Sequence, residues 1–371
     1  MKIVKIETMM VKPRTMFLKM YTDEGIVGYG EPILEGHAHL IKAAIKEFED
    51  YLLGEDPRKI NHHWQVMYRT GFYRGGPVFL SAISGLEQAM WDILGKYVGL
   101  PVYQLLGGSC RDKIKVYSHI RGETPSECVE SAKQQISQGF RAFKVILPCP
   151  IANIDNGEYI NKCVSIVDEV RELVGQKIDI AIDFHGRVNP GMAKILIKKF
   201  EPLNPFFIEE PCLPENIDAL KEVQKSTHIP IATGERLYTK WGYRELLEKQ
   251  AAFILQPDVS HAGGIMELKN IAAMAENYYA LLAPHCPLGP IALASCIQVD
   301  ASIPNFLIQE TLTLGTGYLL NPFSLSDGYI ELPNKPGLGI ELNEDFLKEN
   351  EYDGNWLTPK KFYEDGSIAD W

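Results

Sequence analysis

The stretch KIDIAIDFHGR (177–187) decides the fold of this chain, because it is a short apolar run that ends in an acid, Asp183. The same design returns in PFFIEEP, which carries Glu209, and in IPIATGER, which carries Glu235. The steps from 183 to 209 and from 209 to 235 are both 26 residues, and a segment with helical spacing follows each run. Strands that are buried on both faces need short, nearly continuous apolar runs. The pattern therefore predicts three consecutive strand–helix units, each with a carboxylate at the end of its strand.

Further strand–helix units extend this pattern in both directions, beginning at about Lys113. The predicted strands are 114–120, 140–147, 177–183, 205–210, 229–233, 252–258, 279–285 and 305–310. Amphipathic segments such as MAKILIKKF (192–200) separate them, with apolar residues three and four positions apart. Eight such units over roughly 200 residues predict an α/β fold, a (β/α)8 TIM barrel. We place this catalytic barrel at residues 111–321.

The segments on either side of the barrel are organised differently. Near the N-terminus, MFLKMYT and IVGYGE flank the turn Asp23-Glu24-Gly25, which is a hairpin signal. Helices are predicted at 35–52, 57–69 and 81–98. We interpret residues 1–110 as an N-terminal α+β domain. Residues 322–371 are expected to form a C-terminal segment that packs back on this domain.

The composition is that of an ordinary globular protein. The chain has 371 residues, of which 46% are hydrophobic and 23% are charged, and its net charge is −11. No basic patch is present, which argues against nucleic-acid binding. No apolar run reaches the roughly 18 residues of a membrane helix, and the N-terminus alternates like a strand rather than like a secretion signal. Seven scattered cysteines without a C-x-x-C motif are typical of unpaired thiols, so a cytoplasmic location is expected.

Every predicted barrel strand ends in an ionisable residue. In chain order these residues are His119, Lys144, Asp183, Glu209, Glu235, Asp258, His285 and Glu310, with His185 two positions beyond Asp183. A polar residue that merely caps a strand explains any one of them, but it does not explain eight of eight. The active sites of such barrels lie at the carboxyl ends of the strands. Like charges crowded at this place repel one another unless a counter-charge holds them together.

Three carboxylates at neighbouring strand ends form a set of hard oxygen ligands. Asp183, Glu209 and Glu235 suit one divalent cation per subunit, most often Mg²⁺. A zinc hydrolase is a poor alternative, because the chain has no H-E-x-x-H motif and no histidine among these three positions. P-loop and dinucleotide-binding fingerprints are absent as well. The pattern indicates a magnesium enzyme that acts on a small anion.

Two histidines lie near the acids and suit proton transfer at a carbon next to a carboxylate. His285 is the natural base, and Asp258 can hold its second ring nitrogen, although an N-cap of the following helix explains Asp258 equally well. His185 can donate a proton to a leaving hydroxyl, or else it hydrogen-bonds the metal ligands. Glu310 can bind the substrate carboxylate if it is itself protonated among its acidic neighbours.

These residues and the sequences around them resemble the enolase superfamily, in its mandelate-racemase-like branch, and within it the galactonate dehydratases. The matching motifs are INHHWQVMYRTGFYRGGP, DFHGR, FIEEP, GERLY, LQPDVSHAGGI, LAPHCPLGPIALA and PGLGIE, and they are spread over nearly the whole chain. The resemblance implies a capping domain over a modified barrel, with Mg²⁺ on the three acids. It also implies a His285–Asp258 base, a His185 general acid and a Glu310 that steadies the intermediate.

The sequence departs from these relatives where the substrate would bind. The second strand has one lysine, Lys144, where racemases of this branch usually carry Lys-x-Lys, so a lysine base is not expected there. Lys144 itself either contacts the substrate or is structural. His119 and Arg121 stand where galactonate dehydratases have an aromatic residue and a glycine, and the segment after Glu310 is shorter. These differences affect the choice of sugar more than the chemistry.

Two loops of the capping domain are expected to close over the far end of the substrate. They are VKPRTMF (11–17) and FYRGG (72–76). Arg14 in the first loop then contacts a hydroxyl or a carboxylate of the substrate, unless it is an ordinary solvated loop arginine. Together, Arg14, His119, Arg121 and Lys144 are the candidate substrate-binding residues.

The sequence as a whole predicts a carbon–oxygen lyase, a hydro-lyase that removes water from an aldonate to give a 2-keto-3-deoxy sugar acid. D-galactonate is the leading substrate, and another aldonate or an aldarate is the nearest alternative, followed by an epimerase or racemase of the same fold. A non-catalytic sugar-acid-binding barrel is the alternative from a different class, but such a protein would usually have lost a ligand or a catalytic histidine. The expected partners are a small-molecule acid sugar and further copies of the chain in a homo-oligomer.

Overall fold

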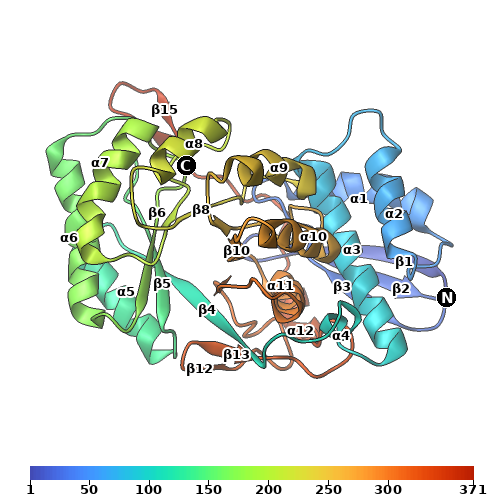
Figure 1. Cartoon of the computed structure of the whole chain (residues 1–371). Coiled ribbons are helices and arrows are strands. Elements are labelled where there is room, and N and C mark those ends of the chain that lie inside the picture. Colours follow the sequence, from blue (N-terminus) through green and yellow to red (C-terminus); the bar gives the residue numbers. More distant parts are fainter.

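The computed structural model describes all 371 residues, and its N-terminal part is a three-stranded antiparallel sheet covered by helices (Figure 1). The strands are β1 (Ile3–Val11), β2 (Thr15–Thr22) and β3 (Val27–Gly30). The helices are α1 (Ala38–Leu52), α2 (Ile60–Arg69) and α3 (Pro77–Val98). The predicted hairpin forms between β2 and β3. Gly30 allows β3 to lie directly on α3, because a Cβ at this position would collide with the main-chain oxygen of Gly85.

The second part is a closed barrel of eight parallel strands. They are β4 (Lys113–Ile120), β5 (Ala142–Ile146), β6 (Asp179–Asp183), β7 (Ile208–Glu209), β8 (Ile231–Thr233), β9 (Ile254–Leu255), β10 (Leu281–Leu282) and β11 (Gln309–Glu310). Each strand from β4 to β10 pairs in parallel with the next, and β11 pairs in parallel with β4. A parallel bridge between Leu282 and Phe306 closes the ring. The predicted α/β barrel with an α+β capping domain is confirmed, although several strands are shorter than expected.

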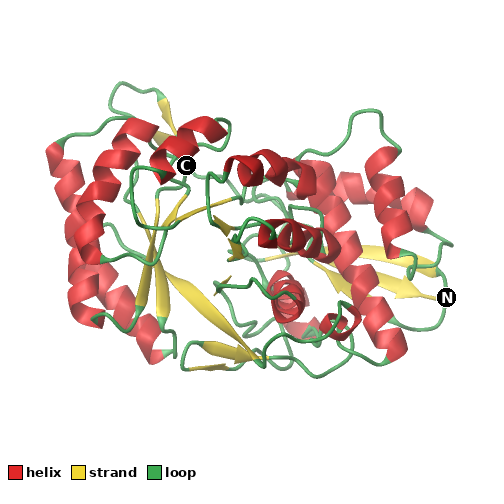
Figure 2. Ribbon diagram, in the orientation of Figure 1, coloured by secondary structure: helices red, strands yellow, loops and turns green.

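Helices cover the outside of the barrel, one after each strand from β4 to β10 (Figure 2). They are α5 (Pro125–Ser137), α6 (Gly157–Val174), α7 (Pro190–Phe200) with the short turn η1 (Glu201–Leu203), α8 (Ile217–Gln224), α9 (Thr239–Lys249), α10 (Ile265–Glu276) and α11 (Pro290–Ser302). The short helix α4 (Val102–Leu105) precedes β4. No helix of the structure combines the length and the apolar character that crossing a membrane requires.

The barrel interior is filled by one apolar layer to which each strand, or a residue directly next to it, contributes. Its members are Tyr117, Ala142, Ala181, Phe207, Ala232, Ile254, Ala283 and Ile308. The rings of Tyr117 and Phe207 meet edge to face, with their centroids 6.2 Å apart, and the alanines of the layer leave room for them. Such filling makes the barrel a packed core rather than a pore. The chemistry is therefore confined to the ends of the strands.

Two buried carboxylates of the capping domain fasten it to the barrel. The helices α10 and α11 have no side-chain N-cap of their own. Glu87, on α3, accepts the main-chain N–H groups of the first two residues of α10 at 2.8 and 2.9 Å. Glu31, just after β3, accepts the N–H groups of Gly289 at 2.6 Å and of Ala292 at 3.0 Å at the start of α11. The N-terminal donors of both helices are thus satisfied by the other domain.

The C-terminal segment contacts both parts of the molecule. It contains β12 (Leu325–Ser326), β13 (Tyr329–Glu331), α12 (Glu344–Glu349), β14 (Lys361–Phe362) and β15 (Ile368–Ala369). β13 pairs with the barrel strand β4, and Glu351 forms a bridge with Val11 of the capping domain. The last residues reach the mouth of the barrel (Figure 1). The segment therefore packs on both domains and not only on the capping domain as we expected, because β13 extends the hydrogen bonding of β4.

Candidate active site

The ionisable residues lie directly above the apolar layer of the barrel interior. Because every second residue of a strand points to the same side, the positions two residues beyond this layer also face inward. These positions hold His119, Lys144, Asp183, Glu209, Gln256, His285 and Glu310. On β8 the corresponding residue is Gly234, and Glu235 follows it. The two-residue alternation of side chains along each strand thus places the predicted residues at the same end of the barrel.

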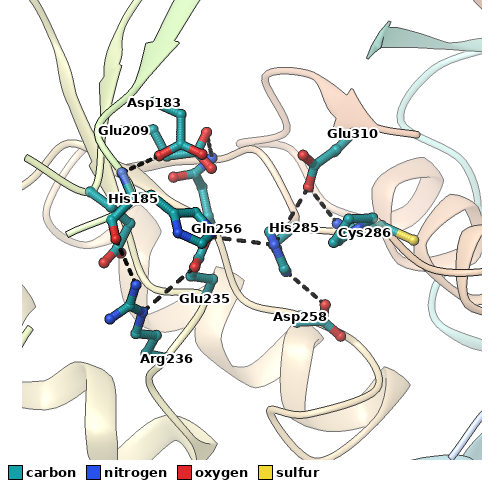
Figure 3. Close-up of polar contacts among 12 residues, drawn as sticks. Asp183, His185, Glu209, Glu235, Arg236, Gln256, Asp258, His285, Cys286 and Glu310 are labelled. Atoms are coloured by element: carbon teal, nitrogen blue, oxygen red, sulfur yellow. Dashed lines mark hydrogen bonds and ion pairs between the residues drawn. The ribbon is translucent and has the colours of Figure 1, made fainter. Parts of the chain in front are cut away.

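His185 leaves the end of β6 through a tight turn. Its φ is 57° and that of Gly186 is 69°, so that both residues are left-handed. The carboxylate of Asp183 stabilises the turn by accepting the main-chain N–H of His185 at 2.6 Å. Gly186 donates its N–H to the main-chain oxygen of Glu210 at 2.8 Å, and Arg236 donates to the main-chain oxygen of His185 at 2.7 Å. The turn holds His185 beside the acids (Figure 3).

Lys144 lies among the acids at the centre of the mouth. It is 2% exposed, and its Nζ lies 2.5 Å from Oε1 of Glu209, 2.6 Å from Oε1 of Glu310 and 3.7 Å from Oδ2 of Asp183. Burial disfavours the ammonium charge, but Glu209 and Glu310 outweigh it and raise the pKa of Lys144 well above its usual value. A charged lysine therefore balances the carboxylates from within the barrel.

His285 and Asp258 form a hydrogen-bonded pair. Nδ1 of His285 lies 2.8 Å from Oδ2 of Asp258, and Oδ1 of Asp258 accepts the N–H of Ser260 at 2.7 Å. The expected role of Asp258 as histidine partner thus corresponds to a contact in the structure. Its alternative role as N-cap of the following helix is wrong, because the N-cap of α10 is Gly264 and Ser260 lies in the turn before that helix. Nε2 of His285 lies 3.4 Å from Oε2 of Glu235 and 3.9 Å from Oε2 of Glu310. Burial disfavours a charged imidazole, but the carboxylates outweigh it and raise the pKa of His285 well above its usual value.

Glu310 is held by donors on both of its oxygens. Oε1 contacts Nε2 of His119 at 2.5 Å as well as Lys144, and Oε2 accepts the main-chain N–H of Cys286 at 2.8 Å. Burial acts to raise the pKa of Glu310, but Lys144, His285 and His119 hold it well below its usual value. These surroundings favour the ionised carboxylate, and not the protonated form that we expected to bind a substrate carboxylate.

The donor set of the three predicted metal ligands suits a hard cation. In this structure Glu235 faces His285, and no three acidic, histidine or cysteine side chains converge as a formed metal site. Oε2 of Glu235 is nevertheless buried without a hydrogen-bond partner, and burial raises the pKa of Glu209 well above its usual value. A buried carboxylate oxygen without a protein donor, such as Oε2 of Glu235, is stabilised by a divalent cation that prefers oxygen ligands. Asp183, Glu209 and Glu235 therefore fit such an ion by their chemistry.

A cavity of about 740 Å³ opens above these residues, which is a common size for a small-molecule site. Asp183, His185, Glu235, His285 and Lys144 are among the residues that line it. The cavity therefore has both histidines and two of the three predicted metal ligands in its wall.

Arg14 and Glu35 reach the cavity from the capping domain. Arg14 donates to the main-chain oxygen of Pro287 at 3.3 Å and lies 3.7 Å from Oε1 of Glu35. Its guanidinium also lies 5.1 Å from the ring centroid of Trp356. These contacts hold the head of Arg14 at the cavity wall, which differs from the environment of a solvated loop arginine.

Other predicted substrate contacts are distributed unequally. His119 and Arg121 line the main cavity and also a second cavity of about 940 Å³, bounded by α5 and by the segment after Glu310. The FYRGG stretch (72–76) does not line the main cavity, and its Phe72 side chain is 92% exposed. Lys144 contacts the acids directly. The structure thus brings Arg14, His119, Arg121 and Lys144 to the cavity wall, but not the second loop.

Three residues of the site were not among the predicted ones. Gln256 donates to Oε2 of Glu209 at 2.7 Å, and Nε of Arg236 lies 3.7 Å from Oε1 of Glu235. Trp371 accepts a hydrogen bond from His185 through its main-chain oxygen. The alternation along LQPD gives a signal for Gln256, since it lies two residues before Asp258. No local pattern points to Trp371, which is 186 residues from His185 in the chain.

Comparison with protein families and known proteins covers nearly the whole chain. Residues 3–107 match the family described as mandelate racemase / muconate lactonizing enzyme, N-terminal domain, and residues 127–346 match the family described as enolase C-terminal domain-like. The chain is 49% identical to a D-galactonate dehydratase of Pectobacterium atrosepticum and 46% identical to one of Verminephrobacter eiseniae, with full coverage of both proteins in each case.

Solved structures with the same architecture were also found. A crystal structure of an enolase from Agrobacterium radiobacter, with bound Na and L-malate, has a TM-score of 0.93 at 30% identity and covers 100% of both chains. A member of the enolase superfamily from Salmonella Typhimurium has a TM-score of 0.88 at 31% identity, over 95% of this chain and 98% of that one. Both agree with the barrel and capping domain described above.

Proposed function

This chain belongs to the mandelate racemase branch of the enolase superfamily, and on this premise we propose that it is a Mg²⁺-dependent hydro-lyase that converts D-galactonate into a 2-keto-3-deoxy sugar acid. The observation that carries the proposal is the pair of histidines in one cavity, His285 bound to Asp258 and His185 beside the acids. Two relatives with 46–49% identity over their full length are D-galactonate dehydratases. Loss of water needs one group that removes a proton and another that gives one.

Binding of the substrate carboxylate is assigned to the acidic end of the cavity. Mg²⁺ held by Asp183, Glu209 and Glu235 would supply positive charge that binds this carboxylate and stabilises the charge that develops on it. Without such charge the C2 proton is very weakly acidic, because its removal places a second negative charge on the carboxylate group. Lys144 and His119 hold Glu310 next to this point.

The proton steps are assigned to the two histidines. The neutral imidazole of His285 removes the proton from C2 through Nε2, while Asp258 holds the proton on Nδ1 and so fixes the tautomer and stabilises the imidazolium that forms. His185 gives a proton to the hydroxyl at C3, which leaves as water. The enol that results tautomerises to the 2-keto-3-deoxy acid. Gln256 and Arg236 orient Glu209 and the His185 turn during these steps.

Recognition of the distal hydroxyls is assigned to the capping domain, which we propose to span residues 1–110. Arg14 and Glu35 offer a donor and an acceptor at the cavity wall, each held by neighbours. Arg121 lines the cavity from the end of β4. A sugar acid with several hydroxyl groups needs such paired polar contacts, because unpaired polar groups in a closed site are costly.

A panel of aldonates and aldarates tests the proposal. The purified protein with Mg²⁺ is incubated with each acid, and 2-keto-3-deoxy products are detected as semicarbazones. Turnover of D-galactonate alone supports the proposed substrate. Turnover of a different acid keeps the mechanism and assigns Arg121 and the short segment after Glu310 to specificity. No turnover of any acid by the metal-loaded protein would overturn the dehydratase function.

A further inference from the structure

The ring of His185 has one partner that is not part of the barrel. Nδ1 of His185 is hydrogen-bonded to the main-chain oxygen of Trp371. The two rings also meet edge to face, with centroids 6.0 Å apart and an interplanar angle of 78°. Trp371 in turn packs on Trp356 at 5.8 Å between centroids. The ring of the proposed general acid is therefore contacted by the C-terminal segment.

This part of the C-terminal segment, residues 351–371, crosses the mouth of the site from the capping domain to the barrel. At its start, Tyr352 donates its N–H to the main-chain oxygen of Met10 at 3.1 Å. At its end, the main-chain oxygen of Asp370 lies 3.7 Å from Sγ of Cys149, after β5. Asp370 and Trp371 both line the main cavity. We call residues 351–371 the mouth strap.

The main-chain position of His185 does not depend on the mouth strap. Asp183 accepts the N–H of His185, and Arg236 donates to its oxygen. Both of these contacts come from the barrel. Only the orientation of the imidazole and the placement of its proton are left to Trp371.

The main-chain oxygen of Trp371 accepts hydrogen bonds and has no proton to give, so this bond requires the proton to be on Nδ1. In a neutral imidazole the other nitrogen, Nε2, is then unprotonated and free. When the ring is protonated, the proton on Nε2 is the one available to the substrate, and after its transfer the Nδ1 proton keeps its partner. Asp258 serves His285 in the same way from the other side of the site.

We propose that Trp371 is the positioning residue of the proposed general acid, through a hydrogen bond from Nδ1 of His185 to its main-chain oxygen that makes Nε2 the proton-donating atom. The inference rests on the proposed dehydratase function, in which His185 protonates the C3 hydroxyl. It also gives the mouth strap a function, since this segment then completes the acid half of the site. The base half, His285 with Asp258, lies entirely within the barrel.

A pair of substrates separates this role from a merely structural one. D-galactonate loses hydroxide, a poor leaving group that needs a proton, whereas 3-deoxy-3-fluoro-D-galactonate loses fluoride, which leaves with the bonding electron pair and needs none. In both reactions the C2 proton goes to His285 and the same kind of enol forms. A chain that ends at Ser367 lacks Trp371 but keeps both histidines, Arg236 and Asp258.

We expect the shortened chain to lose water elimination by roughly 100-fold or more in kcat, which is the usual contribution of a general acid. Fluoride elimination should stay within about threefold of the full chain, since it depends on the base and on substrate binding. Leu357→Ala, at an exposed position of the same strap, is the control and should leave both rates unchanged. Equal losses of both reactions, or no loss of either, would overturn the proposal.

A spectroscopic measurement decides the point without turnover. Long-range ¹H–¹⁵N correlation spectra of protein labelled at histidine report which ring nitrogen carries the proton, and the His185→Asn spectrum identifies the signals of His185. We expect the Nδ1–H tautomer in the full chain and a shift toward Nε2–H in the shortened one. An unchanged tautomer contradicts the inference even if a sugar acid is turned over. If no sugar acid is turned over but the tautomer shifts, the proposed function fails and the hydrogen bond stands.

Discussion

His285 and His185 differ in what surrounds them, and this difference predicts separable functions. His285 is bound to Asp258 and faces Glu235, whereas His185 lies in a left-handed turn and contacts Trp371. His285→Asn should therefore abolish both the exchange of the C2 proton with D₂O and the loss of water. His185→Asn should reduce water loss by about 10²- to 10⁴-fold while it leaves the exchange measurable. Proton NMR of the substrate in D₂O measures both, and loss of exchange in His185→Asn contradicts the assignment.

Lys144 is the counter-charge of the acidic centre in the absence of a bound cation. Its ammonium lies within 2.6 Å of both Glu209 and Glu310 and is almost completely buried. Lys144→Met should lower the free energy of unfolding of the metal-free protein by about 3 kcal/mol, because it removes the buried positive charge that balances Glu209 and Glu310. Denaturant unfolding with and without Mg²⁺ measures the loss, which Mg²⁺ should partly reverse.

The matched control for Lys144 is Lys115, at the opposite end of the barrel. Lys115 pairs with Asp179 at 2.6 Å, but both side chains are about one-third exposed. Such a pair contributes less than about 1 kcal/mol, so Lys115→Met should have a small effect that does not depend on Mg²⁺. A similar loss for both variants would show that the acidic centre does not rely on Lys144.

At the scale of elements, the starts of α10 and α11 depend on carboxylates from the capping domain. A Cβ at Gly289 would lie 2.5 Å from Oε1 of Glu31, and the φ of Gly289 is −90°, which any residue adopts. Gly289→Ala therefore tests the steric effect of the added methyl group without backbone strain. It should displace Glu31 and lower the free energy of unfolding by about 1–2 kcal/mol, the usual cost of a lost N-cap. Gly157→Ala, at the first position of α6 with no atom within 4 Å, is the control for calorimetry and should be neutral.

The cap from Glu31 also predicts a pH dependence of stability. Burial raises the pKa of Glu31 from 4.5 to about 7, against the opposing hydrogen bonds from Ala292 and Gly289. Between these two values the folded state binds the proton and the unfolded state does not, so the contribution of Glu31 to stability falls as pH rises from 4.5 to 7 and is constant above. The stability difference between wild type and Glu31→Gln should decrease across this window by on the order of 3 kcal/mol. Denaturant unfolding at several pH values measures it, and a difference that rises with pH contradicts the shift.

The elements also show how far the sequence could be interpreted alone. The eight strands could be located because each apolar run ends at an inward-facing ionisable residue, so that period and chemistry agree. The sequence does not show how the N-termini of α10 and α11 are capped. Each helix follows a glycine, and the capping carboxylates, Glu87 and Glu31, come from another domain. The contact of Trp371 could not be predicted for the same reason, since its partner His185 is distant in the chain. Contacts between distant segments leave no periodic pattern in the sequence.

At the scale of the whole molecule, direct contacts connect the capping domain, the barrel and the mouth strap. Glu31 and Glu87 fix the capping domain to two barrel helices, and Trp64 donates its indole N–H to the main-chain oxygen of Gly263 at 2.8 Å. The cavity therefore has a wall from each part, with Arg14 from the first and Trp371 from the last. Stability and ligand binding at the mouth should be coupled through this arrangement.

Cation binding at the mouth should raise the stability of the entire chain. An ion that binds only the folded state adds about 2.7 kcal/mol when its free concentration is 100 times its Kd. Calorimetry of chelator-treated protein should therefore show a transition temperature that rises with added Mg²⁺. Glu235→Gln should abolish this rise, because an uncharged amide is a much weaker ligand of a hard cation than a carboxylate. Asp179→Asn, at the opposite end of β6, should keep the full response to Mg²⁺.

An equal response in Glu235→Gln would exclude Glu235 as a ligand, whereas its loss in both variants would mean that the response reports the net charge of −11 rather than a site.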